Sequence, residues 1–485
     1  MKLSHIFTWM LGVVLLAACT QNFEEINTNP NAPESVDAQF LLPHVIKTLA
    51  DDMASNGWES GNLLAQLTTK HDFNDVDRYD LKTNTELWNA SYFRLRDLET
   101  IISQSEAEGG NPAYKGVALV LRAYIAANLT DLWGSIPYSE ALKGAEGSFQ
   151  PTYDTQEEVY TGANGILASL EEANTLLGQG GLPIGGDILF NGDLSMWQKL
   201  ANSLRVRYLL RVSAVYPQAA AELQSIVDND PLMEGNDDNA ALPYLASAPN
   251  QWYVFNTRQG DYENVRMSTT IDTVLQMTLA NSAGDADPRL YDLFKPTAAT
   301  KDQPVKLYIG LPNGLSASSK SSYVLNEIST LGARFRDIPN GVEAQFMMYA
   351  ELQFALAEAA QKGMISGEAS MYYANGVAAA FEYLGVEMPA DYMSREGVAF
   401  AGQELEVIML QKWLASFGNG YEGWYEYRRT GMPALRPSVD NLNGDLIPVR
   451  YIYPTDEQAV NLDNYTSAVS ELGADDYNTK SWWDM

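Results

Sequence analysis

Residues 411–433, QKWLASFGNGYEGWYEYRRTGMP, contain the sharpest local signals in the chain. The spacing predicts one helix that ends at the GNG triplet 418–420, because glycine and asparagine adopt the left-handed backbone of a helix C-cap at little cost. A second, short helix follows, and Gly431 and Pro433 supply its stop signal. The stretch therefore predicts a corner between two helices.

The second of these helices carries an aromatic face. Tyr421, Trp424, Tyr425 and Arg428 stand at positions i, i+3, i+4 and i+7. The guanidinium of Arg428 can then stack on Trp424 one turn earlier. This face is either a ligand site or a buried corner that locks two helices together. Aromatic stripes at helical spacing are usually core, which favours the corner.

The composition restricts the classes of partner and chemistry. The 485 residues are 46% hydrophobic, enough for a large core, and carry a formal net charge of −31. Such an acidic chain argues against nucleic acid or an anionic membrane surface as the main partner. Cys19 is the only cysteine, so no disulfide can form within the chain, and the three histidines lack metal-ligand spacing. We expect no metal and no cofactor.

The first 18 residues predict an export signal. Lys2 precedes an apolar run over 6–18, which is too short to span a bilayer and has the length of a signal-peptide core. The run ends in LAAC at 16–19, which resembles the lipobox of a bacterial lipoprotein, where the cysteine is acylated. Residues 19–35 then form a polar, acylated tether. The alternative is a plain secretory peptide in which Cys19 is incidental.

Helical periodicity dominates the body of the chain. It predicts helices near 37–53, 85–105, 112–133, 155–177, 195–216, 342–362, 369–384 and 403–417. Thr155 and Glu158 form a candidate capping box, as do Ser195 and Gln198. Residues 229–341 are instead rich in Pro, Gly, Asn, Ser and Tyr, with one helix near 269–281. The prediction is one mainly α domain over 36–485: a helical scaffold (36–228 and 342–485) with a loop-rich insertion (229–341).

The motifs of common catalytic sites are missing. The sequence has no GxSxG, HExxH, Walker A or CxxC motif. A glycoside hydrolase needs only two carboxylates, and 62 acidic residues leave that class open, although nothing singles out a pair. We expect a protein without catalytic residues.

Several long segments resemble the SusD/RagB family of outer-membrane nutrient-binding lipoproteins from Bacteroidetes, in its SusD-like branch. They include LRAYIAANLTDLWGSIPYSEAL at 121–142, WQKLANSLRVRYLLR at 197–211, MMYAELQFALAEAA at 347–360 and QKWLASFGNGYEGWYEYRRTG at 411–431. Shorter matches are INTNPNAPE at 26–34, DPRL at 287–290 and IPVRYIYPTDEQAVN at 447–461. The resemblance spans essentially the whole chain.

The resemblance implies a fold and a role. It implies tetratricopeptide-like helix pairs that form an α-α superhelical body, with a loop-rich insertion that carries much of the ligand surface. Such proteins are attached by their lipid to the outer membrane, on the cell surface, and cap a SusC-like, TonB-dependent transporter. They deliver oligosaccharides, or in some members peptides, to that barrel without chemistry. Peptide binding and, from a different class, a secreted glycoside hydrolase remain the alternatives.

The family has no ligand signature to transfer, so the candidate ligand residues come from loop composition. They are Trp58, Asp72, Asn74 and Tyr79 in the early loops, and Trp252, Tyr253, Tyr262, Arg266, Tyr308 and Tyr323 in the insertion. An exposed aromatic ring could stack on a sugar face, while Asp, Asn and Arg side chains hydrogen-bond hydroxyl groups. For each residue the alternative is a structural role.

Overall fold

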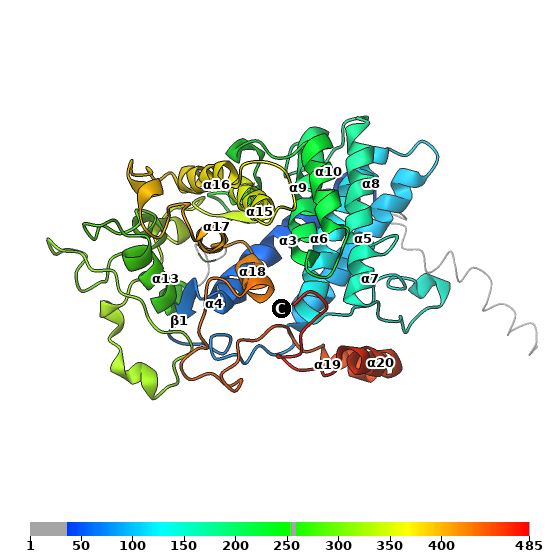
Figure 1. Cartoon of the computed structure of the whole chain (residues 1–485). Coiled ribbons are helices and arrows are strands. Elements are labelled where there is room, and N and C mark those ends of the chain that lie inside the picture. The colour runs from blue at the N-terminus through cyan, green and yellow to red at the C-terminus, as the bar shows by residue number, and fades with distance from the viewer. Residues whose placement is uncertain (1–35, 253, 255–258, 485) are drawn as a thin grey trace, which may run out of the picture.

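A chain of paired helices forms one side of the molecule. The computed structural model describes residues 36–252, 254 and 259–484. The helices on this side are α3 (Ala38–Asn56), α5 (Thr85–Glu106), α6 (Pro112–Trp133), α7 (Gln156–Thr161), α8 (Ile166–Gly178), α9 (Leu194–Val212) and α10 (Ala219–Asn229). Successive long helices pack on one another, α3 on α5, α5 on α6, α6 on α8, and α8 on α9 (Figure 1). The predicted helix pairs are confirmed.

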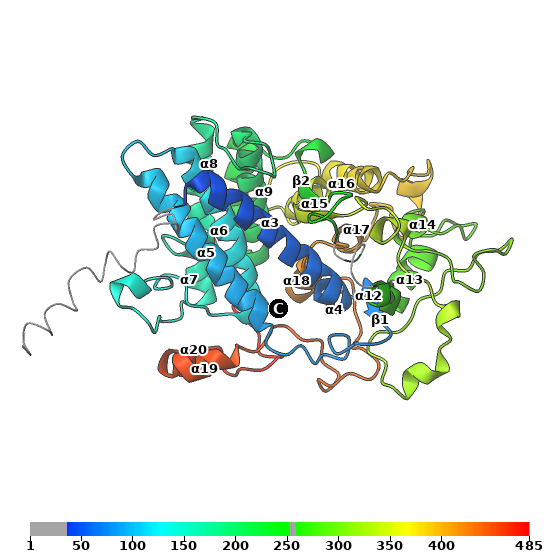
Figure 2. The same cartoon turned by 180° about the vertical axis from the view of Figure 1, so that it is seen from behind.

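The later helices form the other side of the molecule. They are α15 (Tyr349–Gln361), α16 (Ala369–Leu384), α17 (Glu404–Ala415) and α18 (Glu422–Thr430). Helix α15 packs on α9, α16 and α17, and so joins the two sides. Figure 2 shows α3 crossing diagonally between them. Helices α19 (Thr455–Val460) and α20 (Leu462–Leu472) lie together at the lower edge of Figure 1. The mainly α fold class is confirmed.

The connections between the long helices contain short elements and long loops. The short helices are α4 (Asn62–Leu64), α12 (Gln259–Asn264), α13 (Thr269–Thr273) and α14 (Leu290–Leu293), with π-helices η1 (Gly57–Gly61) and η4 (Val274–Thr278). The 3-10 turns are η2 (Gly144–Glu146), η3 (Asn236–Asp238), η5 (Ser319–Ser322), η6 (Leu325–Glu327), η7 (Ala333–Phe335) and η8 (Tyr392–Ser394). Strands β1 (Thr68–Lys70) and β3 (Val265–Met267) pair antiparallel, as do β2 (Ala240–Pro243) and β4 (Glu343–Met347).

Some helix limits follow directly from their capping residues. Helix α6 begins at Pro112, whose missing N–H is no loss at the first helical position, after the N-cap Asn111. It ends at Gly134, which has a positive φ of 87°. The predicted bounds of 112–133 are therefore correct. The Thr155–Glu158 capping box is also confirmed.

Other predicted elements are corrected by the structure. The helix predicted over 155–177 is two helices, α7 and α8, because residues 162–165, which begin and end with glycine, interrupt the helical backbone. The helix predicted from 342 begins instead with strand β4, which pairs with β2, so tertiary pairing overrides the local pattern. Asp193, rather than Ser195, caps α9 with its carboxylate.

The corner at 411–433 lies in the core. Tyr421, Trp424 and Tyr425 are fully buried, and the guanidinium of Arg428 lies 4.9 Å from the centre of a Trp424 ring. Gly61 of η1 lies so close to this turn that an added Cβ would stand 1.8 Å from the carbonyl oxygen of Gly420. The buried-corner interpretation is confirmed.

Buried ion pairs surround the same corner. Arg211 donates to Asp131 Oδ2 at 2.6 Å and also to Glu422 of α18, while Arg429 bonds Glu358 and Glu426. Buried charges need partners of this kind, because an unpaired charge in the interior is strongly destabilising. The network ties α6, α9 and α15 to α18.

Candidate functional site

The loop at 71–84 directly follows strand β1, which belongs to a small two-stranded sheet with β3 of the insertion. Strand β1 pairs with β3, and Ser268 after β3 forms a bridge to Leu311. The bridge at Leu311 brings the 311–315 segment of the insertion to these strands, where Asn313 Nδ2 donates to the Thr68 carbonyl at 2.8 Å. The 71–84 loop begins at the other end of the ladder, after Lys70, because the strands are antiparallel. Figure 2 shows β1 beside α12 and α13 at this end of the molecule.

Asp77 anchors the two segments to each other. Its Oδ2 accepts from the Lys70 backbone N–H at 2.6 Å and from Thr69 Oγ1 at 3.2 Å, and its Oδ1 accepts from Asn313 Nδ2 at 2.7 Å. Burial raises the pKa of Asp77 to about 7, although the hydrogen bonds favour the charged form. The 71–84 loop and the 311–315 segment are therefore held as one unit.

Phe73 stands at the surface of this unit. Its side chain is 83% exposed, and its backbone has a positive φ of 52°, which is uncommon for a non-glycine residue. Asp72 beside it forms an ion pair with Lys320 from the insertion and lies 3.0 Å from His71 Nδ1. Hydrogen bonds from Lys320 and His71 lower the pKa of Asp72, so this carboxylate is ionised at neutral pH.

Two further side chains complete the group. Asn74 Nδ2 donates to the Leu315 carbonyl at 2.7 Å, and Tyr323 is half-buried against the small apolar cluster of Leu311, Leu315 and Ile328. We call His71, Asp72, Phe73, Asn74, Lys320 and Tyr323 the loop surface. It combines one exposed aromatic residue with a carboxylate, an amide and an ammonium group. This is the chemistry that stacks on and hydrogen-bonds a hydroxyl-rich ligand.

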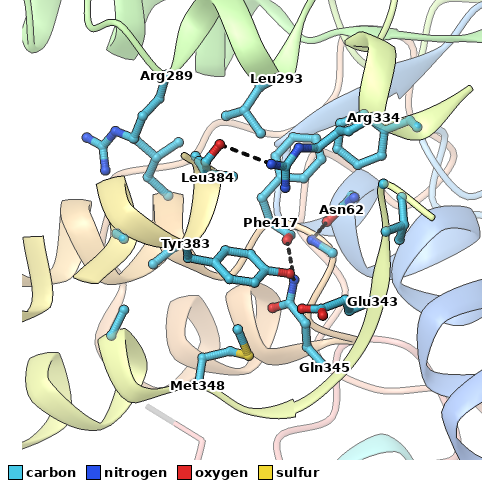
Figure 3. Close-up of a pocket in the computed structure, with 18 of the residues that line it drawn as sticks. Asn62, Arg289, Leu293, Arg334, Glu343, Gln345, Met348, Tyr383, Leu384 and Phe417 are labelled. Atoms are coloured by element: carbon cyan, nitrogen blue, oxygen red, sulfur yellow. Dashed lines mark hydrogen bonds between the residues drawn. The ribbon is translucent and has the colours of Figure 1, made fainter. Parts of the chain in front are cut away.

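A separate interior cavity lies where η1, β4, α16 and α17 meet the insertion (Figure 3). It encloses about 60 Å³. Its walls include the rings of Trp58, Phe335 and Phe417, with ring centres 5.8 Å apart for the first pair and 5.5 Å for the second. Pockets for drug-sized ligands hold roughly 300–1,000 Å³. This cavity is therefore too small for an oligosaccharide.

Comparison with known proteins decides the family. The family model described as "Starch-binding associating with outer membrane", SusD-like, matches residues 30–454. The chain belongs to the SusD-like family. No curated protein matches it. The family consists of outer-membrane nutrient-binding proteins, and the helix-pair fold agrees with it.

Solved SusD-like structures resemble this one along nearly its whole length. A SusD homologue from Bacteroides fragilis is 27% identical, with a TM-score of 0.79, over 92% of this chain and 99% of its own. Another from the same species is 29% identical, with a TM-score of 0.77, over 93% and 99% of the two chains. A chitin-binding protein is 27% identical, with a TM-score of 0.77, over 92% and 99%.

The structure also bears on membrane and metal chemistry. Within residues 36–252, 254 and 259–484, no helix is both long and apolar enough to cross a membrane. The same residues contain no group of three or more His, Cys, Asp or Glu side chains that could hold a metal ion. Cys19 and the predicted signal peptide and tether lie outside the described residues.

The structure buries five of the ten candidate ligand residues of this SusD-like protein: Trp58, Tyr79, Trp252, Tyr262 and Arg266. The hydroxyl of Tyr79 accepts from Ser438 N at 2.9 Å, and the hydroxyl of Tyr262 donates to the Leu331 carbonyl at 2.5 Å. Their polar ends hold loops in place, and their rings present no face at the surface. Trp58 and Trp252 meet edge to face at 5.7 Å beside the cavity.

The remaining candidates divide between the loop surface and its surroundings. Asp72, Asn74 and Tyr323 belong to the loop surface, whereas Tyr308 packs on exposed Tyr291, with ring centres 5.4 Å apart. Tyr253 lies outside the described residues. Sequence reasoning missed Phe73 and Lys320. The sequence of the early loop, HDFND at 71–75, already contains Phe73, but only the fold shows that Phe73 is exposed and that Lys320 reaches Asp72.

Proposed function

We propose that this SusD-like protein captures oligosaccharides with the loop surface and delivers them, without chemistry, to a partner TonB-dependent outer-membrane barrel. One observation carries the proposal: the exposed Phe73 stands in the chain between Asp72, whose ionised carboxylate pairs with Lys320, and Asn74. An aromatic face with hydrogen-bonding groups at its edge suits a sugar ring, which has apolar C–H faces and a polar rim.

The relatives support a glycan as the ligand. A chitin-binding protein shares 27% identity over almost the entire length of both chains. Oligomers of N-acetylglucosamine are therefore the first ligands to test. Within the proposal, the insertion at 229–341 supplies Lys320 and Tyr323, and the scaffold at 36–228 supplies the 71–74 segment.

The anchor and the partner complete the proposal. Acylation of Cys19, followed by the polar tether at 19–35, would hold the protein on the outer membrane at the cell surface. A SusC-like TonB-dependent transporter is the proposed partner. Purification of the lipidated protein from native membranes in mild detergent should recover that barrel, and recovery of the protein without it would contradict this part of the proposal.

Titration calorimetry tests the capture step. Chito-oligosaccharides, α-glucans and β-glucans should be compared with oligopeptides of similar length, and chromatography of each mixture should follow the ligand. The proposal expects saturable binding of one glycan class with no product formed. Saturable binding of peptides alone would favour the peptide alternative, and release of shorter sugars would favour a glycoside hydrolase.

A further inference from the structure

Several residues that line the interior cavity carry buried polar atoms without a hydrogen-bond partner, and two of these residues, Trp58 and Gln345, are uncharged. Trp58, which is 3% exposed, has no acceptor for its Nε1–H, and Gln345, which is 7% exposed, has no donor for its Oε1. The amide nitrogen of Gln345 forms only long hydrogen bonds. Its Nε2 reaches Tyr383 Oη and the Phe417 carbonyl only at 3.4 Å each (Figure 3). Unpaired buried polar groups are unfavourable, so the pair points to a missing partner.

Both arginines of the cavity have a carboxylate partner, although Arg289 Nη1 and Arg334 Nε have no hydrogen-bond partner. Arg334 Nε lies 2.8 Å from Asp292 Oδ2, and its Nη2 donates to the Leu384 carbonyl at 3.2 Å. Arg289 forms a bidentate pair with Asp287. Glu343 stands half-buried, and burial raises the pKa of its carboxyl, while Tyr383 and Arg334 oppose the rise. A charged ligand would lose its hydration in this apolar, aromatic-walled space and would find no unpaired charge of opposite sign to compensate. The cavity therefore favours a neutral ligand.

Size sets the remaining limit on the ligand. The 60 Å³ of the cavity holds about four water-sized groups, since one water needs roughly 10–15 Å³ of such space. A primary or secondary amide bearing one methyl group has this scale. It offers a carbonyl acceptor to the Trp58 Nε1–H, an N–H donor to Gln345 Oε1, and a methyl group to the apolar wall of Leu414 and Met348.

We propose that this cavity is a binding site for a neutral acetamido group, separate from the loop surface. Two sources share this chemistry, a free small amide and the N-acetyl group of a sugar whose ring remains at the mouth. The half-buried residues of the lining include Arg334, Glu343, Tyr383 and Leu384, and we place the mouth of the site at them.

Three molecules of nearly the same shape test the site: acetamide, acetate and acetamidine. Acetamide is neutral, acetate is negatively charged and acetamidine is positively charged. Each has one methyl signal that saturation-transfer NMR with the full-length protein can follow. We expect saturation of the acetamide methyl only. Equal saturation of either charged molecule, or none for acetamide, would overturn the proposal. Displacement of acetamide by N-acetylglucosamine would assign the sugar source, and failure to displace would assign a free amide.

Two variants locate the signal. Trp58→Phe keeps the ring and removes the donor, and Gln345→Met removes the acceptor at similar length. Each should weaken acetamide binding about threefold to tenfold, as expected for one neutral hydrogen bond. Trp197→Phe is the matched control, because Trp197 Nε1 donates to Asp187 at 2.8 Å away from the cavity. Unchanged affinity in both folded cavity variants, or crystals soaked in acetamide that show only water in the cavity, would refute the site.

The test is independent of glycan capture. The probes are small molecules that need neither the loop surface nor the transporter. A negative result would therefore leave the proposed function untouched, and loss of glycan capture would leave the cavity intact.

Discussion

Arg428 of α18 and Asp484, next to the last residue of the chain, form a bidentate ion pair. Arg428 Nε lies 2.9 Å from Asp484 Oδ1, Nη2 lies 3.1 Å from Oδ2, and both side chains are buried. Arg428 also stacks over Trp483 with its guanidinium carbon 4.4 Å from a ring centre. Trp483 and Asp484 are therefore part of the core corner.

Loss of this pair should weaken the whole fold. Asp484→Ala leaves the Arg428 guanidinium buried without its carboxylate, which costs roughly 3–5 kcal/mol. Guanidinium denaturation followed by circular dichroism measures the free energy of unfolding. Asp302→Ala, at an exposed loop position, is the matched control and should change it by less than about 0.5 kcal/mol. Equal stability of the two variants would contradict a core role for the C-terminus.

The contact between η1 and the GNG turn at 418–420 should be disrupted by a single methyl group added at Gly61. Gly61→Ala places a Cβ 1.8 Å from the Gly420 carbonyl oxygen, a backbone atom that cannot move alone. We expect a loss of about 3 kcal/mol in unfolding free energy, the upper end for overpacking. Gly235→Ala serves as the control, since a Cβ there meets nothing within 4 Å and its φ of −172° is ordinary extended backbone. A stable Gly61→Ala variant would show that the two segments are not in contact.

Asp77 should make stability depend on pH. Its pKa is about 7 in the folded chain and about 4 when unfolded, so between those values the folded chain holds an extra proton. The free energy of unfolding should therefore fall as pH rises through this interval, by at most about 1.4 kcal/mol per pH unit, and level off above pH 7. Denaturation series at several pH values, compared between the wild type and Asp77→Asn, check this. The variant should lose that part of the slope, and an identical slope in both proteins would disprove the assignment.

Phe73 should carry much of the ligand affinity. Phe73→Ala removes the exposed ring, and we expect affinity for the captured glycan to fall on the order of tenfold, equal to about 1.4 kcal/mol. Phe149→Ala removes a ring of similar exposure, 79%, at a distant loop and should leave affinity unchanged. Calorimetry on both variants, with melting curves as a fold check, makes the comparison. Equal affinities would place the glycan elsewhere.

Cys19 should determine membrane attachment. Cys19→Ala removes the only thiol available for acylation, so the protein should lose fatty-acid label and leave the membrane fraction. Metabolic labelling with an alkynyl fatty acid, followed by fractionation, measures both. Retention of label in the variant would exclude a lipid on Cys19.

The sequence by itself determined most of the long helices and the kind of corner that the late helices form. Pro112, Gly134 and the GNG triplet act through local backbone preferences, so the bounds of α6 and the break before α18 could be predicted. The aromatic spacing of Tyr421, Trp424 and Arg428 predicted one buried face for the same reason.

Only the tertiary structure decided where candidate ligand residues stand. Trp58 and Trp252 are 194 positions apart in the sequence yet meet beside one cavity, and Lys320 reaches Asp72 across 248 positions. A side chain's exposure and its partners depend on such long-range packing, which local periodicity does not encode. The same limit explains β4: its residues follow a helical pattern, but pairing with β2 makes them a strand.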